Sequence, residues 1–273
     1  MLDFIHQVKE NWRIMPKLAA NLSWLFSDLA FKDRFAAAAS AGFKGVECLF
    51  PYEYPTGDLA ALLDDHGLQQ VLINAPPGDW ERGERGLGCL PGRQDDFRAA
   101  IELAIDYAGA LKCPRIHAMA GIAPRNDQSR DILLENLAVA AQLCGRAGIR
   151  LLIEPINGMD MPGYYLNTPD QAAVLIERVA SPHLSLQFDI YHVAMAGLDL
   201  GEQIERHFSL IDHFQIAGKP GRKEPVNCDI DTTTLFRQID GLGYDGRIGC
   251  EYNQTRLGFS WARDYGIKNP ARP

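Results

Sequence analysis

Long apolar runs, basic runs and paired cysteine motifs are all missing from this sequence. No window of about 18 consecutive apolar residues occurs, so no membrane-spanning helix is expected. No run of basic residues occurs either, and the formal net charge is −8, whereas proteins that bind nucleic acids usually carry a basic surface. These absences predict a protein that binds neither a membrane nor a nucleic acid.

The N-terminal stretch, MLDFIHQVKENWRI, lacks the apolar centre of a secretory signal. The six cysteines are scattered, without a C-x-x-C pair, and several fall in apolar runs that resemble strands. This pattern is typical of buried free thiols in a reducing compartment. We therefore expect a cytoplasmic protein without disulfide bonds.

What is present is an alternation of short apolar runs with helical patterns. The chain has 273 residues, 47% of them hydrophobic and 23% charged, which is ordinary globular composition. The apolar runs lack the period-2 alternation of a half-exposed strand, so they predict parallel strands buried on both faces. Eight such runs occur, at residues 17–24, 45–50, 69–75, 114–120, 150–156, 184–190, 210–217 and 246–252.

The segments between the runs carry apolar residues at helical spacing. The clearest helix is predicted at 131–148, with Gly148 as its terminating residue, and a similar one at 95–112. A third is predicted at 168–179, where Thr168 suits the N-cap and Pro169 the first helical position.

Eight strand–helix units in about 250 residues predict an α/β protein of the (β/α)8 barrel type. A doubly wound open sheet would carry a glycine-rich phosphate turn after an early strand, and GERGLG (83–88) neither follows a strand directly nor matches G-x-G-x-x-G. With no linker or repeat in view, we expect one barrel domain over 17–273. Residues 1–16 are expected to be an N-terminal extension.

Four consecutive predicted strands end in a side chain with a metal-binding oxygen: Glu154, Asp189, Gln215 and Glu251. In a (β/α)8 barrel the C-terminal ends of the strands form the active site. Three buried carboxylates without a cation would repel one another. An oxygen-rich set without thiolates suits a hard divalent cation, so the sequence predicts a Mg2+ or Mn2+ site.

Several stretches of the chain resemble the hydroxypyruvate isomerase family, within the xylose-isomerase-like TIM barrel superfamily. The more specific of these are the FPYEYP turn (50–55) and the GDWERGERG loop (78–86); the EPIN stretch (154–157) and the final Glu-Tyr pair are shared with ketose epimerases of the superfamily. Further matching stretches are ANLSWLF (20–26), MPGYYL (161–166), QFDIYH (187–192) and HFQIAGKPGRKEP (213–225).

The resemblance implies that Glu154, Asp189, Gln215 and Glu251 bind the metal, and that Glu154 and Glu251 are the acid–base pair. Such an enzyme interconverts hydroxypyruvate and tartronate semialdehyde by moving a proton between C3 and C2 through an enediolate. Two carboxylates on different sides of the barrel mouth could flank that flat intermediate, while the metal polarises the carbonyl.

Other polar residues have expected roles around this centre. The resemblance implies a substrate contact for His192 and for Arg222, and Arg85 is a second candidate partner for the substrate carboxylate. Glu47 and His213 are expected behind the ligands, with core packing as the alternative for His213. His117, on the fourth apolar run, is expected to be a core histidine whose hydrogen bonds are satisfied.

Departures from the family pattern leave the substrate open. The family typically has an aspartate and a histidine where this chain has Gly218 and Gly221, in a loop that faces the substrate. A 2-oxotetronate isomerase and a ketose 3-epimerase therefore remain alternatives. A barrel endonuclease is less consistent with the acidic charge and the carboxylate-rich set, and a non-catalytic binding barrel would not require four ligands. The sequence allows a homo-oligomer without specifying one.

Overall fold

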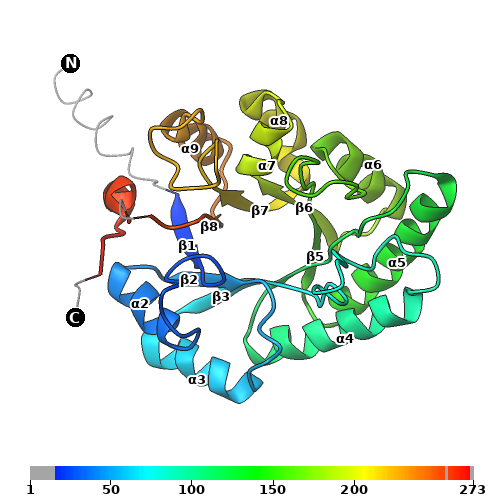
Figure 1. Cartoon of the computed structure of the whole chain (residues 1–273), viewed down its shortest axis with the longest axis horizontal. Helices are drawn as coiled ribbons and strands as arrows, with labels where there is room; N and C mark the ends of the chain where they lie inside the picture. Colours follow the sequence, from blue (N-terminus) through cyan, green and yellow to red (C-terminus); the bar gives the residue numbers. More distant parts are fainter. Residues whose placement is uncertain (1–15, 256–257, 271–273) are drawn as a thin grey trace.

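The computed structural model describes residues 16–255 and 258–270, and its central feature is a closed ring of parallel strands (Figure 1). Each strand pairs with its neighbours in chain order, and β8 closes the ring on β1, where Cys250 lies opposite Ala20. The strands are β1 (Lys17–Asn21), β2 (Gly45–Cys48), β3 (Gln69–Asn74), β4 (Arg115–His117), β5 (Arg150–Ile153), β6 (Leu184–Asp189), β7 (Ile211–Ile216) and β8 (Arg247–Cys250). The predicted (β/α)8 barrel is confirmed.

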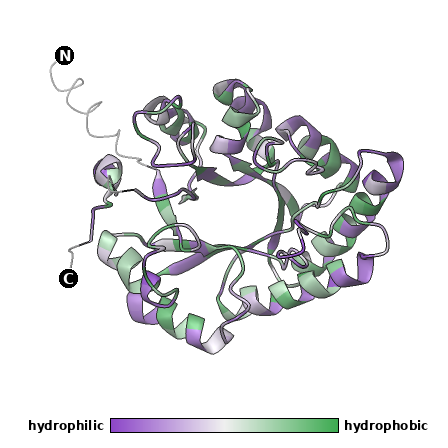
Figure 2. Cartoon of the chain, viewed as in Figure 1, coloured by the Kyte–Doolittle hydropathy of each residue, from purple (hydrophilic) through white to green (hydrophobic). Residues whose placement is uncertain are grey.

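Helices surround the ring on its outside (Figure 1). They carry both hydrophobic and hydrophilic segments, as expected for helices that bury only one face (Figure 2). The helices are α2 (Asp33–Ala41), α3 (Thr56–His66), α4 (Gln94–Ala110), α5 (Asp127–Arg146), α6 (Pro169–Val179), α7 (Ile190–Met195), α8 (Leu200–His207) and α9 (Thr232–Gly241), with short 3-10 turns η1 (Phe208–Leu210) and η2 (Ser260–Tyr265).

The helix boundaries follow the capping residues. The Thr168 hydroxyl accepts a hydrogen bond from the backbone N–H of Gln171, and Pro169 opens α6, as predicted. Helix α5 begins four residues before the predicted start because the Asn126 side chain caps it by accepting from the Ser129 N–H. Gly148 follows the end of α5 with a φ of 72°, a conformation that glycine adopts without strain.

The strands end earlier than the apolar runs do, and this places the polar residues at the rim of the barrel. Pairing of β5 stops at Ile153, so Glu154 and Pro155 lie just beyond the ladder. Similarly, β8 stops at Cys250, and Glu251 follows it. Both glutamates therefore lie at the C-terminal edge of the ring, where the following loops begin.

Glycine at position 249 has a clear packing reason. A Cβ added to Gly249 would lie 2.4 Å from both carboxylate oxygens of Glu47, so the missing side chain leaves room for that buried acid inside the barrel. A small separate cluster of buried apolar side chains contains Ala19, Leu72 and Leu152, from β1, β3 and β5.

The cysteines and the helices were the subject of two further expectations from composition. All six cysteines are free, and five are buried. No helix within the described residues is long and apolar enough to cross a membrane. The predicted N-terminal extension covers residues 1–16, and of these only Pro16 belongs to the described part of the chain.

Candidate active site

A cavity of about 630 Å³ opens at the C-terminal edge of the barrel. Its lining combines carboxylates, imidazoles and arginines with apolar side chains such as Trp24, Phe50 and Met161. Glu154, Glu251, His192, Arg222 and Arg85 all line it, which places most of the predicted site residues around one space. A second cavity of about 650 Å³, at the opposite end of the strands, contains none of them.

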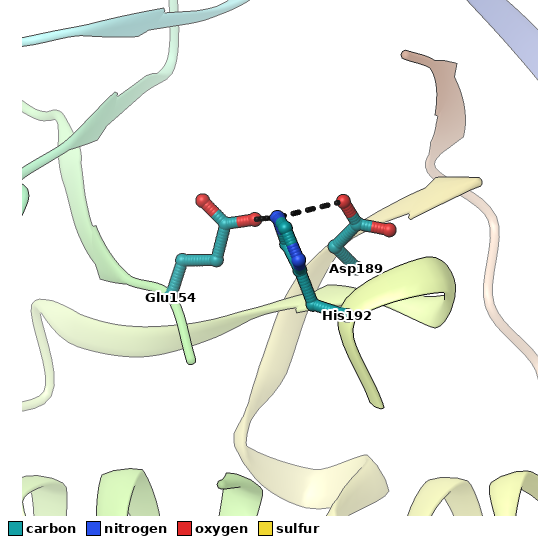
Figure 3. A group of neighbouring side chains, drawn as sticks. All are labelled: Glu154, Asp189 and His192. Carbon is teal, nitrogen blue, oxygen red and sulfur yellow. Dashed lines mark ion pairs between the residues drawn. The ribbon is translucent and has the colours of Figure 1, made fainter. Parts of the chain in front are cut away.

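Three of the predicted ligands are buried carboxylates. Glu154 follows β5, Asp189 ends β6 and Glu251 follows β8, with exposed fractions of 6%, 1% and 7%. In Figure 3 the carboxylates of Glu154 and Asp189 point toward one another, with the imidazole of His192 between them. The barrel thus brings together acids that lie up to 97 positions apart in the chain.

Burial, with repulsion from neighbouring acids, raises the pKa values of all three carboxyl groups. Burial raises the pKa of Glu154 well above its ordinary range, and the charges of Asp189 and Glu251 add to the shift. Burial also raises the pKa of Glu251 to about 8 and that of Asp189 to about 6, even though the positive charge of Arg222 opposes both shifts. Groups with raised pKa values in a cavity are suited to proton transfer at neutral pH.

Arg222 supplies the positive charge of the site. Its Nη2 lies 2.5 Å from Oε1 of Glu251 and 3.4 Å from Oδ2 of Asp189. Its guanidinium packs over the Trp24 ring at 4.5 Å, and its backbone has the unusual φ of 51°. Burial lowers the pKa of Arg222, but the charges of Glu251 and Asp189 outweigh it and leave the pKa raised.

Gln215 lies in β7 directly beneath the acids. Its Nε2 donates to Oε2 of Glu251 at 2.5 Å and to Oε1 of Glu47 at 2.7 Å, while its Oε1 accepts from Gln187. The amide nitrogen therefore faces the carboxylates. For Gln215 to act as an oxygen ligand, its amide would have to make a half-turn.

Glu47 and His213 form a buried hydrogen-bonded pair next to Gln215. Nε2 of His213 lies 2.7 Å from Oε2 of Glu47, and Asn21 donates to both Glu47 and Glu251 at 3.0 Å. This buried network joins β1, β2 and β7 beneath the cavity and orients Glu251 through Asn21 and Gln215.

The donor chemistry fits a divalent cation. Oxygens of Glu154 and Asp189 and a nitrogen of His192 lie within 4.8 Å of one another. A cation among them would offset the repulsion that raises the carboxyl pKa values. As the side chains stand, Glu154 and Asp189 belong to this group, whereas Glu251 and Gln215 lie outside it.

His192 lies in the first turn of α7, and its exposed fraction is 3%. Its Nε2 lies 3.6 Å from Oδ2 of Asp189 and 3.9 Å from Oε1 of Glu154, the contacts drawn dashed in Figure 3. Burial lowers the pKa of His192 well below its ordinary value, and the charge of Arg222 adds to this effect. Burial therefore disfavours the charged form of this imidazole.

The expectation for His117 is wrong. This residue is fully buried at the end of β4, as a core histidine would be, but neither ring nitrogen has a hydrogen-bond partner within the described residues. It lines the cavity, with Nδ1 3.4 Å from Oε2 of Glu154. Burial lowers its pKa to about 3. A run of apolar residues around a histidine could not reveal this, because hydrogen bonding depends on what the barrel places opposite the ring.

Arg85 reaches the cavity without touching the acids. Its guanidinium packs over the Trp80 ring at 3.8 Å and donates to the backbone oxygens of Trp80 and Glu84. It is thus held in place at the wall, and no contact to Glu154, Asp189 or Glu251 is among its hydrogen bonds or ion pairs.

Sequence reasoning also missed Asn157. It lies in the loop after β5, is 1% exposed, and contacts His192. Its position directly after the Glu-Pro-Ile stretch was the available signal, since loops at the C-terminal end of barrel strands carry the functional residues.

The buried acids lie at the C-terminal end of a (β/α)8 barrel, the place where barrel enzymes have their active sites. The family model described as "Xylose isomerase-like TIM barrel" matches residues 35–268. The chain belongs to this family, as the resemblance of its motifs implied.

Individual relatives support an isomerase of this family. The chain is 48% identical to the 2-oxo-tetronate isomerase of Cupriavidus necator, over 92% of this chain and 99% of the relative. It is 40% identical to the hydroxypyruvate isomerase of Escherichia coli, over 92% of this chain and 100% of the relative. A solved structure titled AP endonuclease, family 2, from Brucella melitensis superposes with a TM-score of 0.90 at 41% identity, covering 92% and 99% of the two chains.

Proposed function

We propose that this isomerase interconverts a 3-hydroxy-2-oxo acid and the matching 2-hydroxy-3-oxo acid, with hydroxypyruvate as substrate. The observation that carries the proposal is the pair of buried glutamates, Glu154 and Glu251, whose raised pKa values suit them to take up and release protons near neutral pH. The hydroxypyruvate isomerases among the relatives support the choice of substrate.

Proton transfer gives each glutamate a defined task. Hydroxypyruvate loses a proton from C3 and gains one at C2, so one carboxylate takes the first proton and a carboxyl group delivers the second. Glu154 and Glu251 follow β5 and β8, which are separated by two strands around the ring. They can therefore approach a flat substrate from different directions.

A divalent cation, Mg2+ or Mn2+, is part of the proposal. Glu154, Asp189, Gln215 and Glu251 are its proposed ligands, with Gln215 turning its amide oxygen toward the acids. Bound there, the cation would polarise the substrate carbonyl and stabilise developing negative charge. His192 and either Arg222 or Arg85 are the proposed substrate contacts, the arginine pairing with the carboxylate.

A second candidate substrate is 2-oxotetronate, favoured by the 48% identical relative from Cupriavidus necator. Its reaction is the same proton transfer with a CH2OH group in place of one hydrogen on C3. A cavity of about 630 Å³ has room for the additional carbon and hydroxyl.

An endonuclease activity is not favoured, although one similar structure carries that title. Within the described residues, the only clustered group suited to a metal contains a single histidine with two carboxylates, whereas zinc sites use more nitrogen and sulfur ligands. The net charge of −8 also opposes binding to DNA. We place the enzyme in the cytoplasm because all six cysteines are free thiols.

Proton NMR of the protein with hydroxypyruvate, 2-oxotetronate and a ketohexose in parallel tests the proposal. Each reaction contains added Mg2+ or Mn2+, and a chelator-treated sample serves as the control. We expect conversion of at least one of the two 2-oxo acids and none of the ketohexose. Epimerisation of the ketohexose alone would instead make the protein a ketose 3-epimerase.

A further inference from the structure

The orientation of the Asn157 amide is determined by the backbone of its own loop. Its Oδ1 accepts hydrogen bonds from the N–H groups of Met159 and Asp160, at 3.0 and 2.9 Å. Backbone N–H groups can only donate, so the atom facing them must be the amide oxygen. The Nδ2 group must therefore face the other way, where it lies 3.1 Å from Oδ2 of Asp160 and 2.7 Å from Nδ1 of His192.

This orientation sets the tautomer of His192. An amide NH2 group is only a donor, so Nδ1 of His192 must accept and cannot carry a hydrogen. With Nδ1 bare, the ring must carry its hydrogen on Nε2. That nitrogen lies beside Asp189 and Glu154, so its N–H points among the acids of the cavity (Figure 3).

The tautomer decides between two uses of the same ring. A bare Nε2 would complete a three-ligand group with Glu154 and Asp189, whose candidate ligand atoms all lie within 4.8 Å of one another. A nitrogen that carries hydrogen cannot bind a metal, but it can donate to an oxygen of a substrate. Asn157, which is not among the residues that line the cavity, thus determines whether His192 can bind a metal or donate a hydrogen bond.

We propose that Asn157 is a positioning residue that holds His192 as the Nε2–H tautomer, which keeps this imidazole out of the metal's coordination and presents it to the substrate as a hydrogen-bond donor. The substrate part of this inference rests on the proposed function. The tautomer part rests only on contacts within the chain and can be measured without substrate or metal.

Long-range proton–nitrogen NMR of the full chain labelled with 15N-histidine measures the tautomer directly. The chain has seven histidines, and the signals of His192 are identified by their loss in His192→Gln. In the metal-free protein we expect a bare Nδ1 and a protonated Nε2. A proton on Nδ1 of His192 in the unsubstituted protein would overturn the proposal.

The substitution Asn157→Asp is nearly isosteric, but it replaces the donor that faces Nδ1 of His192 with an acceptor. One carboxylate oxygen can still accept from Met159 and Asp160, while the other now faces Nδ1 of His192 as an acceptor. We expect Nδ1 to gain a proton. If Nδ1 stays bare in this variant, Asn157 does not set the tautomer, and the proposal fails.

Asn167→Asp is the matched control, since it makes the same change in the same loop. Its Nδ2 donates to the backbone oxygen of Ile156 and does not contact His192. We expect the His192 signals to keep the pattern of the unsubstituted protein. The same tautomer change in both variants would show a general effect of loop disturbance and would contradict a specific role for Asn157. If Asn157→Asp fails to fold, the spectrum of the unsubstituted protein still decides.

Kinetics test the substrate part. Asn157→Asp should lower kcat/KM for the preferred 2-oxo acid by about 10–100-fold, the usual effect of losing a residue that orients a ligand, while Asn167→Asp should retain activity. An Asn157→Asp variant with changed tautomer and unchanged kcat/KM would remove the substrate role. If the unsubstituted protein converts neither 2-oxo acid, the proposed function fails, whereas the tautomer result stands by itself.

Discussion

Arg222 donates through Nη2 to the carboxylate of Glu251 at 2.5 Å, in a cavity where both side chains are largely buried. This pair offsets part of the repulsion among the acids, since the charge of Arg222 opposes the rise in the pKa values of Glu251, Asp189 and Glu154. The offset is incomplete, because burial still leaves all three pKa values raised. The consequences can be tested.

Stability of the metal-free protein should fall as pH rises. The pKa of Glu251 is about 8 in the folded chain against an ordinary 4.5, and that of Asp189 is about 6 against 3.8. Across these windows the unfolded chain has released protons that the folded chain still binds, so each unit of pH removes stability, by about 1.4 kcal/mol per group at most. Urea unfolding at pH 5 and pH 8 in the presence of a chelator measures this.

Added Mg2+ or Mn2+ should recover stability more at pH 8 than at pH 5, because the ion binds the ionised acids. Glu251→Gln is the control, since it should reduce the pH dependence between pH 5 and 8. A metal-free protein that is equally stable at both pH values would contradict the raised pKa values.

Replacing Glu251 by glutamine should slow proton transfer while leaving an amide oxygen for the metal. We expect Glu251→Gln to lower kcat by about 10²–10⁴-fold, the usual range for a general acid–base, and by more than it weakens metal binding. In D2O the unsubstituted enzyme should place deuterium at C2 of the tartronate semialdehyde formed from hydroxypyruvate. Product free of solvent deuterium at early conversion would indicate hydride transfer and remove the acid–base roles.

The partner of the substrate carboxylate can be found by comparing Arg85→Ala with Arg222→Ala. Losing the true partner should raise KM by one to two orders of magnitude, or about 1.5–3 kcal/mol for a charged hydrogen bond. Arg222→Ala should also raise the pKa of Glu251 because it removes the opposing charge, so a shifted pH–rate profile separates this effect from carboxylate binding. Wild-type KM in both variants would mean that neither arginine recognises the carboxylate.

Gln215→Leu tests the ligand set. The variant cannot offer an amide oxygen, so calorimetry should show weaker binding of Mg2+ or Mn2+. It also removes a donor from buried Glu47, so its free energy of unfolding should fall by about 1–3 kcal/mol. Unchanged metal affinity would show that Gln215 is not a ligand and that its amide nitrogen stays directed at the acids.

His117→Leu tests why a histidine is kept where neither ring nitrogen has a hydrogen-bond partner among the described residues. A buried polar group without a partner costs about 1–3 kcal/mol, so an apolar replacement should leave stability unchanged or raise it. Because the ring lies 3.4 Å from Glu154, we expect turnover to fall. The control is His207→Leu in α8, which breaks a contact to Asp170 outside the cavity and should lower stability but not turnover. A fully active His117→Leu variant would show that the ring has no role in the reaction.

The sequence by itself determined the barrel and the place of its acids. Eight apolar runs without period-2 alternation specify parallel strands buried on both faces, and a closed ring is the arrangement that buries them all. Glu154 and Glu251 come directly after two of these runs, so their place at the C-terminal edge followed from local pattern. Thr168 and Pro169 likewise marked the start of α6, because capping depends on neighbours three residues away.

Only the tertiary structure decided what each polar group faces. Asn21 and Glu251 are hydrogen-bonded although 230 positions separate them, and His213 meets Glu47 across 166 positions. The direction of the Gln215 amide and the tautomer of His192 depend on such pairs, as does the lack of a partner for His117 in the described part of the chain. The local sequence specifies on which face of a strand a side chain lies. The hydrogen bonds of that side chain depend on the atoms that closure of the barrel brings to the same face.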